Sequence, residues 1–544
     1  MVMIKKHSVS VTVDASKEVG IYHHDWRYVG YDECNYTYHP EGAELIQKFS
    51  ELGESGPYYF RTHFLFCTGN LQHTYKWGST NIYQEDEKGN PVYNFTTFDR
   101  ILSTYLDHGA KPFVELGFMP MDLVDQKYYP KTTEDWNAYN IYRTIGSACP
   151  PKDYDKWYAL VFETVKHCVE KYGKEEVLTW KWELWNEPDI FYWNGTCQEY
   201  CKLFDYTEKA VHDALPNAML SGPASTGPYP DSPHAKFLEQ FLDHCKNGVN
   251  YATGAVGTRL DFITFHVKGG AFLFDHKAKK DVPSIKKFMV QCKNGMEIIQ
   301  KYGYGGLEVV LSEADPDGWA AGGIGDNPNM RFRNSEYYAT YVASSYHNLH
   351  RLCKQMGMHV MPIAWAFLFV GESCFSGTRT FTTQGIDKPV FNLFKLYGKL
   401  GEREVKFYST GETDALAYPD DFATGIAPEV NGFAVKKEDG SVQILLYSHH
   451  DDIDLPDHSC VSLEIFGVPE DASVTCWRID RDHSNAHTLW KQMNCPDYPD
   501  KNQWNQLAEA GNLQQSKEKI CREGRKLLIE TELPAHAVIL FDVR

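Results

Sequence analysis

The feature that most constrains this chain is an alternation of short apolar runs and amphipathic segments over its first 400 or so residues. Helical segments such as Thr97–His108, Trp157–Tyr172 and Glu199–Ala214 carry apolar residues at three-to-four spacing. Eight repeated β–α units predict the α/β class and a (β/α)8 TIM barrel with insertions, whose chemistry lies at the C-terminal ends of the strands. The eight expected strands are Glu18–His23, Tyr58–Phe64, Lys111–Gly117, Val177–Glu187, Met219–Ala224, Asp261–Val267, Leu307–Ala314 and Val360–Phe367.

The pattern changes near residue 405, where short strands separated by turn residues replace the β–α alternation. These strands predict a C-terminal β-sandwich domain. We therefore expect a catalytic barrel over 16–404 and an accessory sandwich over 405–544. The alternating residues at 1–15 form an N-terminal strand that is expected to join the sandwich, and the polar stretch Asp497–Gln515 is expected to form a surface helix.

Composition excludes several classes of partner and cofactor. The formal net charge of −19 argues against nucleic acid, which needs a basic face. We find no apolar run of about 18 residues, so no membrane span is expected, and the N-terminus lacks the apolar centre of a signal peptide, which predicts a cytoplasmic protein with reduced thiols. Cys197 and Cys201 lack a second ligand pair, so no metal site is predicted. The carboxylate chemistry described next needs no organic cofactor, so none is expected. The sequence does not indicate an oligomeric state.

Two glutamates follow apolar runs in a similar way. Glu187 comes after Asn186 and before Pro188, and Glu313 follows Val309–Ser312 and is three residues before Pro316. Strand tips of a barrel face one funnel, so both carboxylates are expected there. A pair of carboxylates is what glycoside hydrolysis needs: one donates a proton to the leaving oxygen, and the other attacks the anomeric carbon or activates water. Trp182 and Trp185 are expected to shield Glu187. The alternative is that both glutamates form structural salt bridges.

The residues around these glutamates resemble a known family. Trp185-Asn186-Glu187-Pro188 with a seventh-strand glutamate resembles the retaining barrel glycosidases, and more specifically glycoside hydrolase family 39. Further stretches that carry the resemblance are Phe60–His63, Pro112–Pro120, Ser221–Pro223, Asp261–His266, Arg478–Asp480 and His483–Ala486. The resemblance implies a barrel with a β-sandwich, retention of configuration, Glu187 as acid/base and Glu313 as nucleophile.

The family has β-xylosidase and α-L-iduronidase branches, whose sugars differ at C5: iduronate carries a carboxylate there and xylose carries none. Several residues resemble the iduronidase branch. By this resemblance Lys268 and Arg379 clamp the substrate carboxylate, Gly318 adds a backbone N–H beside Trp319, and Asp315 orients nearby groups. Asn186 is expected to bond the 2-hydroxyl of the sugar.

Other roles remain open for several of these residues. Lys268 could instead be solvated outside the barrel, and Arg379 could pair with Glu372 or Asp387. His63 either orients Glu313, binds a hydroxyl or is a core histidine. His266 lies at the end of the sixth expected strand and is structural or supports the substrate site.

These observations predict a retaining exo-glycosidase that removes a terminal sugar from oligosaccharides. The first expectation is α-L-iduronic acid from fragments derived from glycosaminoglycans, and the alternative is a β-xylosidase or related pentosidase. A carbohydrate-binding protein without activity would be expected to lack one carboxylate. A uronic acid lyase would prefer Tyr, His or Lys as its base, and the paired glutamates argue against it.

Overall fold

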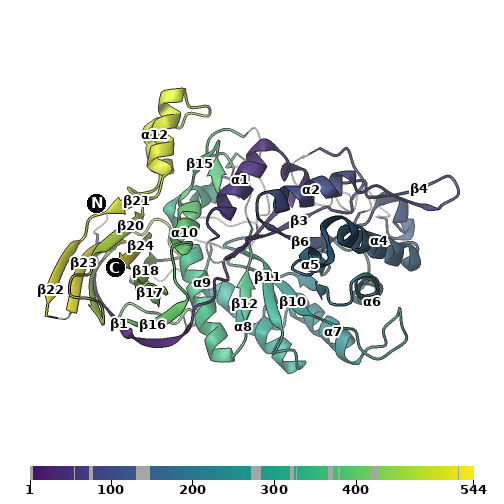
Figure 1. Ribbon diagram of the computed structural model, residues 1–544, viewed down its shortest axis with the longest axis horizontal. Helices are drawn as coiled ribbons and strands as arrows, with labels where there is room; N and C mark the ends of the chain where they lie inside the picture. Colours follow the sequence, from purple (N-terminus) through teal and green to yellow (C-terminus); the bar gives the residue numbers. More distant parts are fainter. Residues whose placement is uncertain are drawn as a thin grey trace.

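The computed structural model describes most of the chain and has a mixed α/β architecture. The described residues are 4–53, 56–72, 77–129, 147–270, 283–318, 324–325, 327–365, 372–377, 380–417, 426–524 and 526–544. Figure 1 shows a large sheet at one end of the molecule and, at the other end, a group of parallel strands surrounded by helices.

Parallel strands in the first 365 residues are connected in a ring. The strands form two parallel sheets, one of six strands and one of four. Within each sheet a strand pairs with the next ring strand along the chain, and the last ring strand pairs with the first. One residue, Gly222, separates β8 from β9, and Ile363 separates β12 from β13, so each of these two segments bridges the two halves of the ring. The strands are β2 (Tyr28–Glu33), β3 (Tyr59–His63), β6 (Lys111–Leu116), β7 (Lys181–Leu184), β8 (Met219–Ser221), β9 (Pro223–Ser225), β10 (Phe262–Lys268), β11 (Glu308–Asp315), β12 (Val360–Pro362) and β13 (Ala364–Trp365).

Helices follow the ring strands and pack their apolar faces inward. α4, for example, buries Trp157, Leu160 and Val165 along one side, as the three-to-four spacing predicts. α6 begins at a capping box in which the Thr196 and Glu199 side chains each bond the other residue's backbone N–H. The helices of this part are α1 (Pro40–Ser50), α2 (Thr96–Asp107), α4 (Tyr154–Tyr172), α5 (Lys174–Val177), α6 (Cys197–Ala214), α7 (Pro233–Asn247), α8 (Ile285–Lys301), α9 (Glu336–Met356) and α10 (Pro389–Tyr397).

Shorter elements lie in the connections between these strands and helices. They are the hairpins β4 (Tyr83–Glu85) with β5 (Pro91–Tyr93) and β14 (Thr382–Thr383) with β15 (Ile386–Asp387), and the 3-10 turns η1 (Cys34–Tyr36), η2 (Met121–Leu123), η3 (Gln126–Tyr128) and η6 (Pro328–Asn334).

The first ring strand differs from the sequence prediction. Most of Glu18–His23 is the exposed end of β1 (Lys6–Ile21), and the ring strand is Tyr28–Glu33 instead. This strand contains Gly30 and ends in two acidic residues, so its composition does not resemble a buried strand. Gly30 is needed there because a Cβ atom would lie 2.2 Å from the ring of Trp365. Tertiary packing therefore overrides the local strand signal.

The C-terminal part forms one continuous ten-stranded sheet, where the sequence predicted a sandwich. β1 joins this sheet by pairing antiparallel with β16 and parallel with β19. Apolar side chains from strands near both ends of the order, Cys476 and Ile539 near one end and Ile529 near the other, share one core with Val11 from β1, so the sheet curls around it. The strand order is β21 (Gln514–Ser516), β20 (Val474–Ile479), β24 (Ala537–Val543), β18 (Val442–His449), β17 (Glu429–Lys436), β16 (Arg403–Ser409), β1, β19 (His458–Phe466), β23 (Lys526–Pro534) and β22 (Lys519–Glu523).

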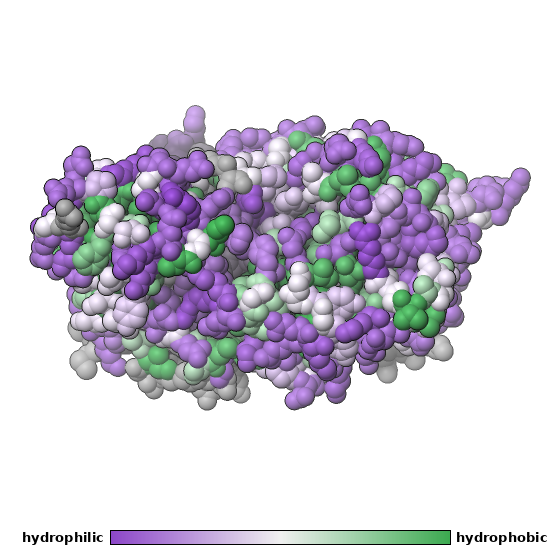
Figure 2. Space-filling view, turned by 60° about the horizontal axis from the view of Figure 1, so that its bottom comes forward, coloured by the Kyte–Doolittle hydropathy of each residue, from purple (hydrophilic) through white to green (hydrophobic). Residues whose placement is uncertain are grey.

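Two helices, α11 (Ala486–Gln492) and α12 (Lys501–Gly511), lie between β20 and β21. α12 is the surface helix expected within Asp497–Gln515. Figure 2 shows a face that is mostly hydrophilic, with small scattered apolar patches. Among the described helices, none is long and apolar enough to cross a membrane. All fourteen cysteines have free thiols.

Candidate active site

Glu313 lies near the C-terminal end of β11 and is almost fully buried. Its Oε2 atom is 2.7 Å from Nζ of Lys268, and its Oε1 atom is 3.5 Å from Nε2 of His63 and 3.6 Å from a guanidinium nitrogen of Arg61. Burial raises the pKa of a carboxyl group, but Lys268, His266 and His63 outweigh burial and hold the pKa of Glu313 well below its usual value. Glu313 is therefore ionised at neutral pH, as a nucleophile must be.

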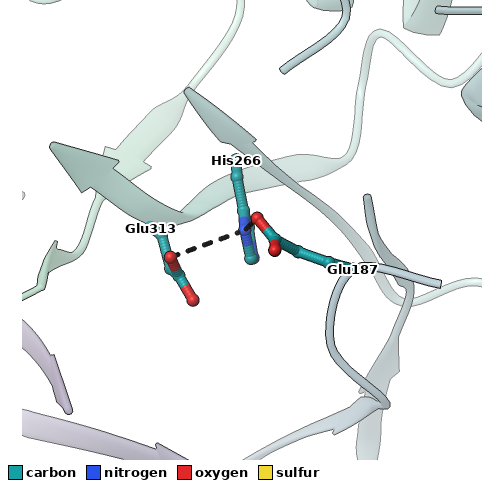
Figure 3. Close-up of side chains that lie close together, drawn as sticks. All are labelled: Glu187, His266 and Glu313. Atoms are coloured by element: carbon teal, nitrogen blue, oxygen red, sulfur yellow. Dashed lines mark hydrogen bonds and ion pairs between the residues drawn. The ribbon is translucent and has the colours of Figure 1, made fainter. Parts of the chain in front are cut away.

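Glu187 stands three residues beyond the end of β7 and faces Glu313 across the ring (Figure 3). Trp185 and Glu187 both have left-handed backbones, with φ of 67° and 45°, a conformation that costs energy for residues other than glycine. The Glu187 N–H is fixed by a hydrogen bond of 2.8 Å to the carbonyl of Ala224 on β9. The sharp turn therefore aims the carboxylate into the ring.

His266 on β10 connects the two glutamates. Its Nδ1 atom is 2.9 Å from Oε1 of Glu187 and 3.7 Å from Oε2 of Glu313 (Figure 3). One oxygen of each glutamate and this nitrogen all lie within 4.8 Å of one another. Retaining glycosidases hold their carboxyl groups about 5–5.5 Å apart, and inverting ones about 6.5–9.5 Å apart. The spacing here matches retention.

Glu187, His266 and Glu313 are also close enough together to bind one metal ion. In the described part of the chain, they form the one group of three or more potential metal ligands with that spacing. Lys268 already places a positive charge 2.7 Å from Glu313. A dication in this position would repel that ammonium group, so the donor set fits a carboxylate pair for acid–base and nucleophilic chemistry better than a metal centre.

Arg61 on β3 is the buried centre of the charges behind the two glutamates. Its Nε atom donates to Glu183 at 2.5 Å, and one terminal nitrogen contacts Glu115 at 2.9 Å and Oδ1 of Asn186 at 3.1 Å. Burial opposes the charge, but the carboxylates of Glu183 and Glu115 raise the pKa of Arg61. The bond to Asn186 fixes this amide, so its NH2 group is directed away from Arg61 and can serve as a donor to a substrate hydroxyl.

His63 lies at the end of β3 between Glu115 and Glu313. Its Nδ1 atom is 2.6 Å from Glu115, and its Nε2 atom is 3.4 Å from Asp32 and 3.5 Å from Glu313. Burial lowers the pKa of a histidine, but the Glu115 carboxylate outweighs burial and the pKa of His63 rises to about 9. A protonated His63 carries a proton on both ring nitrogens, so it donates to Glu115 from Nδ1 and points Nε2–H at Glu313, which it positions.

Lys268 contacts Glu313 at 2.7 Å and Asp315 at 2.5 Å, and its side chain is 19% exposed. It is therefore in the cavity and not solvated outside the strands, which was the alternative left open by the sequence. Burial raises the pKa of Asp315, while Lys268 and Arg333 oppose that shift. Both carboxylates raise the pKa of Lys268, which remains charged.

A cavity of about 520 Å³ opens at this edge of the ring. Among the predicted site residues, His63, Asn186, Glu187, Lys268, Glu313 and Gly318 line it. Asp315 and His266 do not line the cavity, but they contact the lining residues Lys268 and Glu187, respectively. The Gly318 N–H donates to the carbonyl of Gly270 at 3.1 Å, so the donor expected for the substrate is already used within the protein. Trp319 and Arg379 lie outside the described residues, so their predicted roles stay predictions.

Some site residues were not found from the sequence. Trp365 at the end of β13 lines the cavity, and its ring is 4.7 Å from that of His63 and 5.2 Å from the Arg61 guanidinium carbon. Trp182 and Trp185 were expected to shield Glu187, but their rings pack beside Trp180 and Trp193, respectively. The sequence did contain a signal for Trp365, because it lies near the C-terminal end of the eighth expected strand. The C-terminal ends of barrel strands face the central funnel, so a tryptophan there could have been predicted to line the site.

The wall of the cavity beyond Glu187 also comes from segments that the sequence left unassigned. They include Ile190, Phe191, Tyr192, Thr226, Tyr229 and His234. Asp189 organises part of this wall by accepting bonds from Thr226 and from Nδ1 of His234 at 2.7 Å.

Comparison with known proteins agrees with this geometry. The family model "Glycosyl hydrolases family 39" matches residues 9–525. A β-xylosidase of Caldicellulosiruptor saccharolyticus is 25% identical over 78% of this chain and 78% of its own length, and a mouse α-L-iduronidase is 24% identical over 76% of this chain and 63% of its own. A bacterial orthologue of human α-L-iduronidase has a similar structure, with a TM-score of 0.76 at 20% identity over 99% of this chain and 84% of that one. The chain belongs to glycosyl hydrolase family 39.

Proposed function

We propose that this glycosidase uses Glu313 as nucleophile and Glu187 as acid/base in a two-step, retaining, exo-acting reaction on oligosaccharides. One observation supports this assignment above all others: an ionised Glu313 and a cavity-lining Glu187 present oxygens within 4.8 Å of each other. We also infer that the ring of parallel strands is the family's (β/α)8 barrel and the curled sheet its β-sandwich. The division expected at 1–15, 16–404 and 405–544 belongs to the same proposal, with its boundaries moved to the end of β1 at Ile21 and the start of β16 at Arg403.

The proposed reaction uses the two glutamates in turn. Glu313 attacks the anomeric carbon while Glu187 gives its proton to the departing oxygen, and a glycosyl ester forms on Glu313. Glu187, now anionic, takes a proton from water, which attacks the same carbon and releases the sugar with its original configuration. His266 contacts Glu187 at 2.9 Å and can hold it in place through both steps.

For the sugar itself, we propose α-L-iduronic acid. Lys268 supports this choice because it places an ammonium group in the cavity 2.7 Å from the nucleophile, where the sugar ring must bind. A buried carboxylate on the substrate needs a cation or donors. The relatives named above include an α-L-iduronidase. Fragments derived from glycosaminoglycans are the corresponding substrate class.

A β-xylosidase is the second candidate, and one contact favours it. Asp315 and Glu313 both bind Lys268, so two carboxylates balance a single ammonium charge in this cavity. A sugar without a C5 substituent would leave those ion pairs undisturbed. A β-xylosidase is also among the relatives.

Hydrolysis of two substrates by the wild-type enzyme separates these candidates: 4-methylumbelliferyl α-L-iduronide and 4-nitrophenyl β-D-xyloside. We expect a higher kcat/KM for the iduronide. In Lys268→Met, the ratio of iduronide to xyloside kcat/KM should fall by about tenfold or more, because a charge-assisted contact is lost. Lys181→Met is the matched control: Lys181 is also buried, but it pairs with Glu308 at the other end of the strands. A ratio that favours the xyloside, or that Lys268→Met leaves unchanged, contradicts the iduronide proposal.

A further inference from the structure

A second cavity, of about 660 Å³, lies where the C-terminal helix α12 meets the ring part of the molecule. Figure 1 shows α12, β15 and α1 next to one another there. The cavity shares no lining residue with the active-site cavity. Its lining residues are Glu41, Glu44, Lys48, Glu372, Thr380, Thr382, Thr383, Gln384, Gly385, Ile386, Asp387, Tyr498, Trp504, Ala508 and Asn512.

Two aromatic side chains of this cavity are exposed. Tyr498 is 73% exposed and Trp504 is 37% exposed, although tryptophan is on average a highly buried residue. The Trp504 ring is held in place because its Nε1–H donates to the carbonyl of Gln384 at 2.9 Å and its edge lies over Gly385. A fixed, exposed aromatic ring costs little entropy on binding and offers an apolar face to a ligand.

The polar lining is acidic and rich in hydroxyl groups. Glu41 and Glu44 extend from the first half of α1, and Glu372 comes from the segment before the β14–β15 hairpin. These carboxylates do not form a metal site. Among the described residues, three potential ligands lie close enough to share an ion only in the active site. Lys48 is the one lysine among the described lining residues, and it is paired with Asp387 at 2.8 Å; Lys395 also pairs with Asp387, at 2.6 Å, so the acidic character comes mainly from Glu41 and Glu44. The cavity therefore offers spaced acceptors and would repel an anion.

Hydrogen bonds within the protein hold the wall of this cavity in place without a ligand. The Gln384 side chain donates to the carbonyls of Glu372 and Asp497 at 3.2 and 3.1 Å, and the Cys374 N–H donates to the same Asp497 carbonyl at 2.8 Å. Lys48 also bonds the carbonyl of Gly385 at 3.1 Å. These bonds join α1, the hairpin and the segment before α12, so little reorganisation would oppose binding.

We propose that this cavity is a second saccharide-binding site, which takes an uncharged oligosaccharide. Sugar hydroxyls donate to the spaced carboxylates, and the apolar face of a sugar ring packs on Trp504. Uronic acids and sulfated sugars are excluded by the acidic lining. The proposal is independent of which sugar the active site removes.

Isothermal titration calorimetry tests this site with xylotetraose, cellotetraose and tetra-N-acetylchitotetraose, and with tetragalacturonate as the acidic comparison. The Glu313→Ala variant is used as the parent so that no probe is cleaved. We expect at least one neutral probe to bind with a Kd of about 1 mM or tighter, and tetragalacturonate to bind at least about tenfold more weakly.

Variants assign that signal to one cavity or the other. Trp504→Ala in the same parent should weaken the neutral probe by about tenfold or more, in line with the loss of a stacked ring. Tyr408→Ala removes another exposed aromatic residue, on β16, and should bind as the parent does. An unchanged melting temperature verifies that each variant is folded.

Three results would overturn the proposal. One is no binding by any neutral probe, and another is equal binding by the Trp504→Ala variant, which would place the signal in the active site. The third is a dimer in sedimentation that Trp504→Ala dissociates, because the cavity would then be covered by a second copy of the chain. A failure of the iduronide proposal would appear in the hydrolysis ratios and leave these titrations unaffected.

Discussion

The centre of the strand ring and the core of the ten-stranded sheet are both buried, yet they are filled with opposite kinds of side chain. The ring centre holds Arg61, Glu115 and Glu183 with no exposed side-chain surface, and His63, Lys268 and Glu313 lie beside them. The sheet core is aliphatic, as at Val11 and Leu463, which face each other in register. The contrast shows where this chain gives up stability for chemistry.

The physical reason lies in desolvation. Burying a charge costs several kcal/mol, and a partner repays that cost only with good geometry, whereas burying an aliphatic side chain is favourable by about 1.5–3 kcal/mol. Glu313 keeps a low pKa only because cations surround it. We therefore expect substitutions in the ring centre to affect activity most, and substitutions in the sheet core to affect stability alone.

The largest effect should come from Glu313→Gly. Removing the proposed nucleophile is expected to lower kcat by about 10⁴-fold or more, because no ester intermediate could then form. Added azide should restore part of the activity and yield a glycosyl azide of inverted configuration, which NMR identifies. A rescued product with retained configuration would assign the nucleophile elsewhere.

Glu187→Ala tests the other glutamate and should show an effect that depends on the leaving group. A proton donor contributes about 10²–10⁴-fold when the departing oxygen is basic. We expect a loss of that size for a natural disaccharide and a much smaller loss in the first step for a dinitrophenyl glycoside. Azide should here give a product of retained configuration. Equal losses for both leaving groups would argue against Glu187 as the acid.

The comparison between the two cores is tested most directly by Arg61→Met and Leu463→Ala. Arg61→Met leaves Glu115 and Glu183 without their cation, which should cost about 3–5 kcal/mol of unfolding free energy together with most of the activity. Leu463→Ala should cost about 2–5 kcal/mol with kcat unchanged. Urea unfolding and aryl glycoside kinetics measure both. Similar activity in the two variants would break the contrast.

Two buried histidines, His63 in the ring centre and His487 on α11 beside a separate apolar cluster, should show opposite pH dependence. Because the pKa of His63 rises to about 9 on folding, its stabilisation is complete below about pH 6.5 and is lost as the pH rises through 9, about 3 kcal/mol in total. His487 packs against Phe375 and Trp490 in an apolar cluster beside the sheet, where burial lowers its pKa to about 3. Its contribution is present above about pH 6.5 and is lost as the pH falls toward 3.

Urea unfolding of His63→Gln and His487→Gln at pH 4.5, 7 and 9.5 measures these contributions. The difference from wild type should shrink at pH 9.5 for His63→Gln and at pH 4.5 for His487→Gln. A pH-independent difference in either variant would show that the histidine does not change its proton affinity on folding.

Sequence patterns were sufficient for the parts of the fold with strong periodicity. The strand that precedes Glu187, the strand that carries Glu313 and the helices α2, α4 and α6 were expected near their observed places. The first ring strand was misplaced because Tyr28–Glu33 contains a glycine and two acids, and its strand conformation depends on packing against Trp365. The Gly318 N–H could not be assigned correctly, because its acceptor, the Gly270 carbonyl, is 48 residues away in the chain.

The amino-acid sequence was enough to recognise the family by resemblance and to predict that the two glutamates meet, because an apolar run that ends in a carboxylate and a proline is a local pattern. It could not provide the ionisation of Glu313, the charge of His63 or the ion pairs that Lys268 makes with Glu313 and Asp315. Each of these depends on partners from other strands, such as Glu115 beside His63 and Asp315 beside Lys268. Electrostatic energies depend on distance and burial in three dimensions, and separation along the chain determines neither.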